Sequence, residues 1–164
     1  MITCKNPILS GFYPDPSICR VGEWFYLGYI YFCIFSGNSC ISQQKSGTMG
    51  ADRKYIDTGE PAALQGCEHN EGIYAPTLRW HKGTFYLITT NISGGGNFIV
   101  TAKNPQGPWS ESHFLENARG IDPSLFFDED GTCYYIGQRE NSRGGRYNGD
   151  CEIWIQKLDL QTFR

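Results

Sequence analysis

The stretch that decides the fold is "DPSLFFDEDGTCYYIG" at residues 122–137. It resembles two earlier stretches of the chain, "DPSICRVGEWFYLGY" from Asp15 and "APTLRWHKGTFYLIT" from Ala75. Each starts with a small or acidic residue, proline, a hydroxyl residue and an aliphatic residue, then passes through a glycine turn into an aromatic-rich run. The turn glycines are Gly22, Gly83 and Gly131. Two extended runs joined by a short glycine turn predict a β-hairpin, and the chain contains three.

The spacing of these repeats indicates a β-propeller. The repeats start at residues 15, 75 and 122, and so are offset by 60 and 47 residues. Repeats of roughly this length that contain hairpins favour propeller blades. Residues 97–105 and 151–160 alternate apolar and polar side chains, which predicts an outer strand after the second and third hairpins. We therefore predict an all-β fold with about three blades of a propeller.

Composition and charge exclude several classes of protein. The chain has 164 residues and a net charge of −3, which argues against binding to nucleic acid or an anionic membrane. The N-terminus lacks a signal-peptide pattern, and the longest apolar run, residues 24–35, is too short to span a bilayer. The seven cysteines are irregularly spaced, which supports neither a disulfide framework nor a zinc site. We expect a cytoplasmic protein with free thiols, no metal and no cofactor.

An acidic residue stands between two prolines in "GFYPDPSICR", residues 11–20. Proline restricts its own backbone and that of the preceding residue, so we expect residues 13–16 to be extended. A turn-forming Asp-Pro pair before a strand is the alternative for this stretch taken alone. Asp15 and Asp122, however, hold the same place in two repeats, and equivalent positions of propeller blades converge near the axis. We expect both carboxylates to face one cavity.

The three repeats, read with their flanks, resemble glycoside hydrolase family 43. The motifs are "NPILSGFYPDPSI", "GIYAPTLRWHKGTFYLITTN" and "RGIDPSLFFDEDG", and the similarity extends over residues 4–27 and 60–160. The resemblance implies a five-bladed β-propeller and a β-xylosidase or α-L-arabinofuranosidase that acts on xylo- or arabino-oligosaccharides with inversion and without a cofactor. Residues 1–164 would be the N-terminal part of that catalytic domain.

The resemblance also implies roles for individual residues. Asp15 falls on the general base that activates water, and Asp122 on a third carboxylate that tunes the pKa of the general acid and orients the sugar. Tyr74 falls where the family places an aromatic ring against the sugar, and Asn91 is expected to face the same pocket. Inversion requires an acid and a base about 6.5–9.5 Å apart, with a water between the base and the sugar.

One departure from the family concerns the general acid, a glutamate in an E-G-P type motif. The chain reaches "KLDLQTFR" at its end without this motif; Glu140 and Glu152 are the nearest candidates, and neither precedes Gly-Pro. A non-catalytic carbohydrate-binding or vestigial propeller fragment is therefore an alternative function. A fructan-cleaving five-bladed hydrolase is a further alternative, against which the "IDPSLFFDEDG" context argues by resemblance. Both glutamates are expected to be exposed.

The other departure is residues 28–58, which do not resemble the family although both flanks do. This segment is either a divergent insertion or the product of a shifted reading frame; a shift of one nucleotide would convert Met49–Gly50 into tryptophan, at a position where the family has one. Within it, residues 36–54 have few apolar positions and predict a polar loop. Residues 139–150 predict a long loop, from which Arg139 or Arg143 could reach a substrate.

Overall fold

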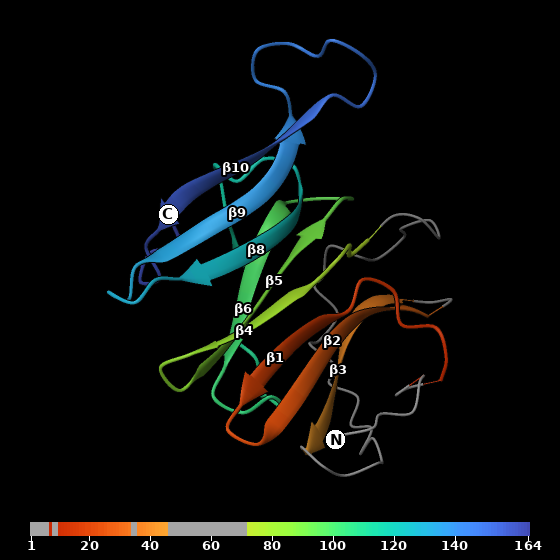
Figure 1. The fold of residues 1–164 in the computed structure, drawn as a ribbon, viewed down its shortest axis with the longest axis vertical. Coiled ribbons are helices and arrows are strands. Elements are labelled where there is room, and N and C mark those ends of the chain that lie inside the picture. The colour runs from red at the N-terminus through yellow and green to blue at the C-terminus, as the bar shows by residue number, and fades with distance from the viewer. Residues whose placement is uncertain (1–6, 8–9, 34–35, 46–71) are drawn as a thin grey trace, which may run out of the picture.

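The computed structural model describes Pro7 and residues 10–33, 36–45 and 72–164. The regular elements of this part are all strands, arranged in three antiparallel sheets (Figure 1). The sheet orders are β1–β2–β3, β4–β5–β6–β7 and β10–β9–β8. The strands are β1 (Ser17–Val21), β2 (Trp24–Cys33), β3 (Ser36–Lys45), β4 (Thr77–His81), β5 (Thr84–Asn91), β6 (Gly96–Ala102), β7 (His113–Phe114), β8 (Ile121–Phe127), β9 (Cys133–Glu140) and β10 (Cys151–Leu158). Within these ranges there is no helix with the length and hydrophobicity that crossing a membrane requires.

The three predicted hairpins are confirmed as β1–β2, β4–β5 and β8–β9. In the second hairpin the turn residues Lys82 and Gly83 have φ of 45° and 81°. Two successive left-handed residues form the type of turn whose twist matches that of the flanking strands. The predicted outer strands are also present, as β6 in the second sheet and β10 in the third.

The second sheet lies between the other two, and its opposite faces form two cores. β4 packs beside β1 on one side and β8 on the other. Alternation along β5 sends Leu87 toward the first sheet and Ile88 toward the third. The first core consists of Cys19, Ile73, Leu78, Phe85, Leu87, Phe98 and Val100. The second core consists of Ile88, Ile99, Leu115, Ala118, Leu125, Cys133, Tyr135 and Leu158.

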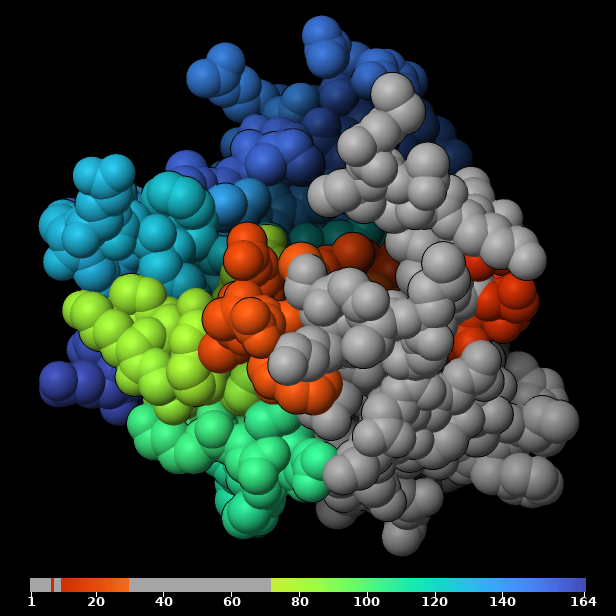
Figure 2. Space-filling model, turned by 60° about the horizontal axis from the view of Figure 1, so that its bottom comes forward, coloured from red at the N-terminus to blue at the C-terminus, as the bar shows by residue number. Residues whose placement is uncertain are grey.

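The hairpin turns gather on one face of the molecule. In Figure 2 the cyan and yellow-green parts of the third and second sheets lie next to each other at the left, with the orange part of the first sheet beside them. The second and third turns are adjacent, since the ring of His81 stacks on that of Phe127 with centroids 4.1 Å apart. Each first strand begins at the end remote from its turn. The starts of β1, β4 and β8 therefore lie on the opposite face.

The prediction of a polar loop over residues 36–54 is wrong for residues 36–45. These residues form β3, which pairs antiparallel with β2 so that Ser42 lies opposite Leu27. Strand pairing uses backbone N–H and C=O groups, and it therefore does not require the apolar alternation on which the prediction depended. Residues 46–54 lie outside the described part, as do residues 34–35 and 55–58 of the 28–58 segment, and the attribution of that segment to a frame shift or an insertion stays a prediction.

The third sheet has a second apolar face, turned away from the second sheet. Ile153 and Ile155 are 75% and 59% exposed on β10, and Phe126 on β8 is 50% exposed. The intervening residues, Leu125 and Trp154, point toward the second core instead. The third sheet is thus apolar on both sides but covered on only one.

Candidate active site

Asp15 and Asp122 are placed at equivalent points of the first and third sheets. Asp15 lies two residues before β1, and Asp122 is the second residue of β8. Because β4 lies between β1 and β8 and all three strands start on the same face, the two carboxyl groups lie on that face together. The pKa of the Asp122 carboxyl is raised above its ordinary value by burial and, secondly, by the negative charge of Asp15. Both aspartates remain accessible to solvent.

The backbone at both aspartates is left-handed. Asp15 has φ of 48° and Asp122 has φ of 54°, and each is followed by proline. The expected extended geometry is therefore wrong for Asp15. Aspartate enters this region more readily than most residues, but a non-glycine residue there still costs about 1–2 kcal/mol. Strain of this kind, repeated at equivalent positions, is typical of a functional site.

A β-bulge accompanies this conformation at Asp122. The β8–β9 register shifts between Ile121 and Ser124, so that Asp122 and Pro123 are not part of the regular ladder. Proline has no N–H to donate and is tolerated in sheets mainly at such irregularities. A bulge also redirects a side chain. The bulge explains how the strand can present the Asp122 carboxyl at its starting end.

Tyr74 is tied to the end of β5. Its backbone N–H donates to Thr90 O at 2.9 Å, and its carbonyl accepts from Thr89 Oγ1 at 2.8 Å. This pairing extends the second hairpin to the face where the aspartates lie, and it leaves the Tyr74 ring partly exposed. The predicted packing of this ring against a sugar stays a prediction.

Asn91 lies just below this surface. Its side chain is 1% exposed, and its Oδ1 accepts from Ser93 N at 3.1 Å. Its Nδ2 is buried and has no hydrogen-bond partner. Direct contact with a ligand would require the residues that cover Asn91 to move. Its predicted contact with substrate therefore stays a prediction.

The two glutamates considered for the general acid have different surroundings. Glu152 Oε1 accepts from Arg139 Nε at 2.8 Å, and this hydrogen bond holds the pKa of Glu152 below its ordinary value. Arg139 also lies over the Trp154 ring, 4.6 Å from its centroid, so its guanidinium is already engaged. Glu140 is exposed at the end of β9. An ionised Glu152 cannot protonate a leaving group, so it does not fit the role of a general acid.

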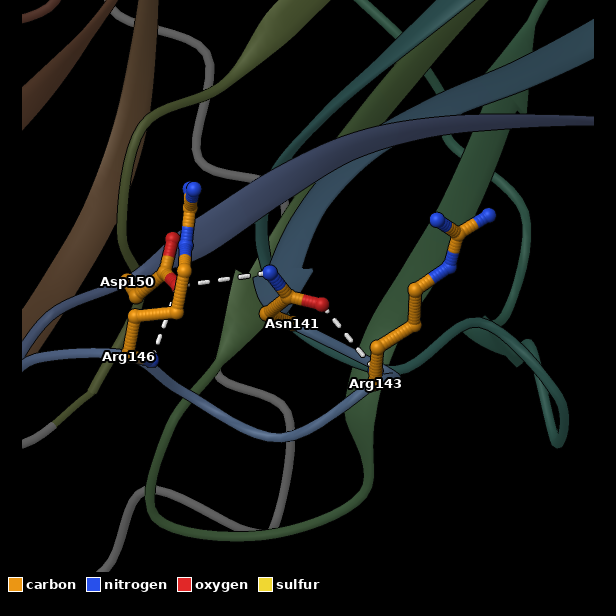
Figure 3. A network of polar contacts seen from close by, with 4 residues as sticks. All are labelled: Asn141, Arg143, Arg146 and Asp150. Carbon is orange, nitrogen blue, oxygen red and sulfur yellow. Dashed lines mark hydrogen bonds and ion pairs between the residues drawn. The ribbon is translucent and has the colours of Figure 1, made fainter.

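The loop between β9 and β10 contains a network of polar contacts that its sequence did not indicate. Asp150 is 6% exposed, and its Oδ2 accepts from Arg146 N at 3.0 Å, Arg146 Nε at 3.2 Å and Asn141 Nδ2 at 3.3 Å (Figure 3). These hydrogen bonds lower the pKa of Asp150. In Figure 3 the Arg143 side chain points away from this network, while its backbone N–H donates to Asn141. Because β9 runs antiparallel to β8, this loop is at the same end of the third sheet as Asp122.

Sequence reasoning missed the polar contacts that tie the first strands together. Arg79 on β4 donates to Leu125 O and to Ser124 Oγ on β8, each at 3.0 Å. On the other side of β4, Leu78 N donates to Ser17 Oγ of β1 at 3.0 Å. The serine that follows each Asp-Pro pair therefore binds β4. The repeated Asp-Pro-Ser pattern could have indicated that the two serines have equivalent roles, but the sequence alone does not identify the residues that their hydroxyl groups bind.

Within the described ranges, no group of three or more histidine, cysteine, aspartate or glutamate side chains could hold a metal ion. Cys19, Cys133 and Cys151 are free thiols, as predicted for these three. The described site therefore offers two interacting carboxyl groups, with a partly exposed aromatic residue on the same face of the molecule.

The sequence of the chain matches a known protein family over nearly its whole length. The sequence model of glycosyl hydrolases family 43 matches residues 4–164. The chain belongs to this family. This family 43 chain is 52% identical over 166 residues to a xylosidase/arabinosidase of Butyrivibrio fibrisolvens, and the match covers 100% of the chain and 32% of the relative. It is 44% identical over 138 residues to a non-reducing end alpha-L-arabinofuranosidase of Bacteroides ovatus, with 82% of the chain and 26% of the relative covered.

The fold agrees with this assignment. The crystal structure of a xylan beta-1,4-xylosidase from Bacillus halodurans C-125 superposes with a TM-score of 0.78 at 34% identity, and the match covers 96% of this chain and 31% of that one. The predicted all-β class and partial five-bladed propeller are confirmed. The family 43 chain spans about a third of the length of the relatives it matches.

Proposed function

We propose that this chain supplies the water-activating part of a glycoside hydrolase site that cleaves β-xylosides or α-L-arabinofuranosides with inversion. The observation that carries the proposal is the electrostatic interaction between Asp15 and Asp122, two carboxyl groups at equivalent points of two sheets. In this scheme the carboxylate of Asp15 takes a proton from the water that attacks the anomeric carbon. Asp122 orients the sugar and raises the pKa of a neighbouring acid by its charge.

The proton for the leaving group needs a second carboxylic acid on the opposite side of the sugar. Glu152 does not fit this role because Arg139 keeps it ionised. We propose that the acid belongs to a part of the enzyme outside these 164 residues, since the Butyrivibrio relative matches the chain over only 32% of its length. The exposed apolar face of Ile153 and Ile155 agrees with this, because exposed faces of this kind mark interaction surfaces.

A second candidate function is that of a carbohydrate-binding or vestigial fragment without catalysis. It is favoured by the same incomplete coverage and by the ion pair of Glu152 with Arg139, which makes Glu152 unsuitable as the acid. General acid catalysis contributes about 10²–10⁴ in rate, so its loss would leave binding largely intact while suppressing turnover.

Release of 4-nitrophenol from the xyloside and the arabinofuranoside by the purified chain separates the two candidates, together with titration of xylobiose and arabinobiose by NMR. Turnover that Asp15→Asn abolishes would support the hydrolase. Saturable binding without turnover, weakened by Asp122→Asn, would support the binding fragment. Asp130→Asn is the matched control, because Asp130 lies in the β8–β9 turn on the opposite face and should affect neither. The absence of both binding and turnover would contradict the hydrolase and the carbohydrate-binding fragment, and would leave only a vestigial fragment.

A further inference from the structure

Asn97 on β6 is the centre of a buried polar network. Its side chain is 1% exposed, and its Nδ2 donates to Ala118 O at 2.6 Å, to Tyr135 OH at 2.8 Å and to Gly120 O at 3.3 Å. Its Oδ1 accepts from Thr90 Oγ1 at 2.6 Å. Because the amide group has only two hydrogens, the two shorter contacts are the principal ones and the third is shared. One side chain of the second sheet thus binds β9 and the segment that enters β8.

The segment that Asn97 holds leads directly to Asp122. Gly120 has φ of 100°, and a Cβ added to it would overlap the carbonyl oxygen of Gln138 on β9. The segment is therefore held by the Asn97 amide and pressed against β9, with no space for it to shift toward that strand. Two residues after Gly120, the chain adopts the left-handed conformation and the bulge that present Asp122.

The strained conformation of Asp122 needs support from its surroundings. A left-handed non-glycine residue persists only where neighbouring contacts determine it. The hydrogen bonds from Asn97 to the carbonyls of Ala118 and Gly120 supply such support. Burial makes them costly to break, because these carbonyls would then be left without partners. Asn97 carries no net charge and binds the backbone that leads to Asp122, so its main route of influence on Asp122 is the position of that backbone.

We propose that Asn97 is a positioning residue that fixes the entry to β8 and thereby holds the Asp122 carboxyl within reach of Asp15. This proposal depends on the proposed function only in that Asp122 is taken as a site residue. The second sheet has Ala75 at the position where the other two repeats have aspartate, so it supplies no equivalent carboxyl group. The proposal gives this sheet a different role, which is to position a carboxyl group of the third sheet.

The test measures the interaction between the two aspartates with and without Asn97. The pKa of Asp122 is followed by carboxyl ¹³C NMR in the complete chain and in Asp15→Asn, and the difference gives the effect of the Asp15 charge. The same pair is then measured in the background of Asn97→Ala. Tyr135→Phe is the matched control, because it removes another buried polar group of the network but leaves both carbonyl hydrogen bonds of Asn97 in place.

We expect Asn97→Ala to reduce the effect of Asp15 on Asp122 to less than half, and Tyr135→Phe to leave it unchanged. A purely structural Asn97 would lower the stability of the fold without changing this difference in molecules that remain folded. An unchanged difference in Asn97→Ala would overturn the proposal, and so would an equal loss in both variants. Because neither readout involves sugar or turnover, the result is independent of whether the proposed hydrolysis occurs.

A measurement on the unsubstituted chain covers the case in which Asn97→Ala does not fold. ¹⁵N relaxation should show Gly120 and Asp122 to be as rigid as Leu125 in the middle of β8, with the Asn97 amide protons protected from exchange. Gly120 and Asp122 amides that are distinctly more mobile than the amide of Leu125 would show that the Asn97 hydrogen bonds do not fix the segment, and the proposal would fail.

Discussion

The negative charge of Asp15, before the first strand of one sheet, raises the pKa of Asp122, in the first strand of another sheet. The two residues are 107 positions apart in the chain and are brought together because β4 lies between β1 and β8. Burial makes the larger contribution to the raised pKa, and the charge of Asp15 adds to it. The pair therefore has a measurable electrostatic signature that does not depend on substrate.

Neutralising Asp15 should lower the pKa of Asp122. Asp15→Asn removes the charge but not the burial, so the Asp122 pKa should fall toward its ordinary value of 3.8 without reaching it. Carboxyl ¹³C chemical shifts measured against pH report this change directly. Asp128→Asn, a substitution in the distant β8–β9 turn, should leave the titration of Asp122 unchanged. A titration that is identical in Asp15→Asn and in the unsubstituted chain would contradict the interaction.

Replacing Asp122 should stabilise the chain in a pH-dependent way. A carboxyl whose pKa is raised on folding holds its proton more tightly in the folded state, so its ionisation destabilises that state as pH rises through the folded pKa. Asp122→Asn cannot ionise, and asparagine tolerates a left-handed backbone at least as well as aspartate does. We expect the Tm to rise by about 1–3 °C at pH 7, a small gain because the side chain is exposed.

The same comparison at pH 3 is the control for that effect. Asp122 is then largely protonated in both the folded and the unfolded chain, so the gain from Asp122→Asn should disappear. Thermal melts followed by circular dichroism at both pH values suffice. An equal gain at pH 3 and pH 7 would show that the backbone preference of asparagine, and not the charge of Asp122, is the cause.

Two glycines with left-handed backbones should respond very differently to alanine. Gly83 has φ of 81° and no atom within 4 Å of an added Cβ, so Gly83→Ala should cost only the backbone strain, about 1–2 kcal/mol. Gly120 has φ of 100°, and its added Cβ would overlap the Gln138 carbonyl oxygen. We expect Gly120→Ala to lower the free energy of unfolding by more than about 3 kcal/mol. Urea unfolding measures both, and similar losses would mean that Gly120 is not tightly packed.

The planar guanidinium of Arg79 should not be replaceable by an amine. Arg79 binds Leu125 O and Ser124 Oγ on β8 and also the carbonyl of Leu78. Lysine cannot reproduce this set of fixed directions, so Arg79→Lys should cost about 1–3 kcal/mol in urea unfolding.

Arg143→Lys is the matched control for Arg79→Lys, since the Arg143 side chain is exposed on the β9–β10 loop. It should change the free energy of unfolding by less than about 0.5 kcal/mol. Equal effects of the two substitutions would show that the contacts of Arg79 with β8 do not stabilise the packing of the second sheet against the third.

The sequence by itself determined the hairpins, the all-β class and the equivalence of Asp15 and Asp122. These features follow from local rules, because a glycine turn and an alternating strand are specified within about a dozen residues. Local rules were also where the sequence misled: the proline after Asp15 indicated an extended backbone, and the polar composition of residues 36–45 indicated a loop. For residues 36–45, backbone pairing with β2 decided the outcome.

Only the tertiary structure decided which polar groups meet. Asn97 and Tyr135 are 38 residues apart, and Arg79 and Leu125 are 46 apart, so no local pattern pairs them. Burial makes such pairs important, because a buried donor or carbonyl without a partner costs much more free energy than an exposed one. The same reason applies to the site: the chain specified two carboxyl groups, whereas the packing of three sheets set their spacing, their backbone strain and the raised pKa of Asp122.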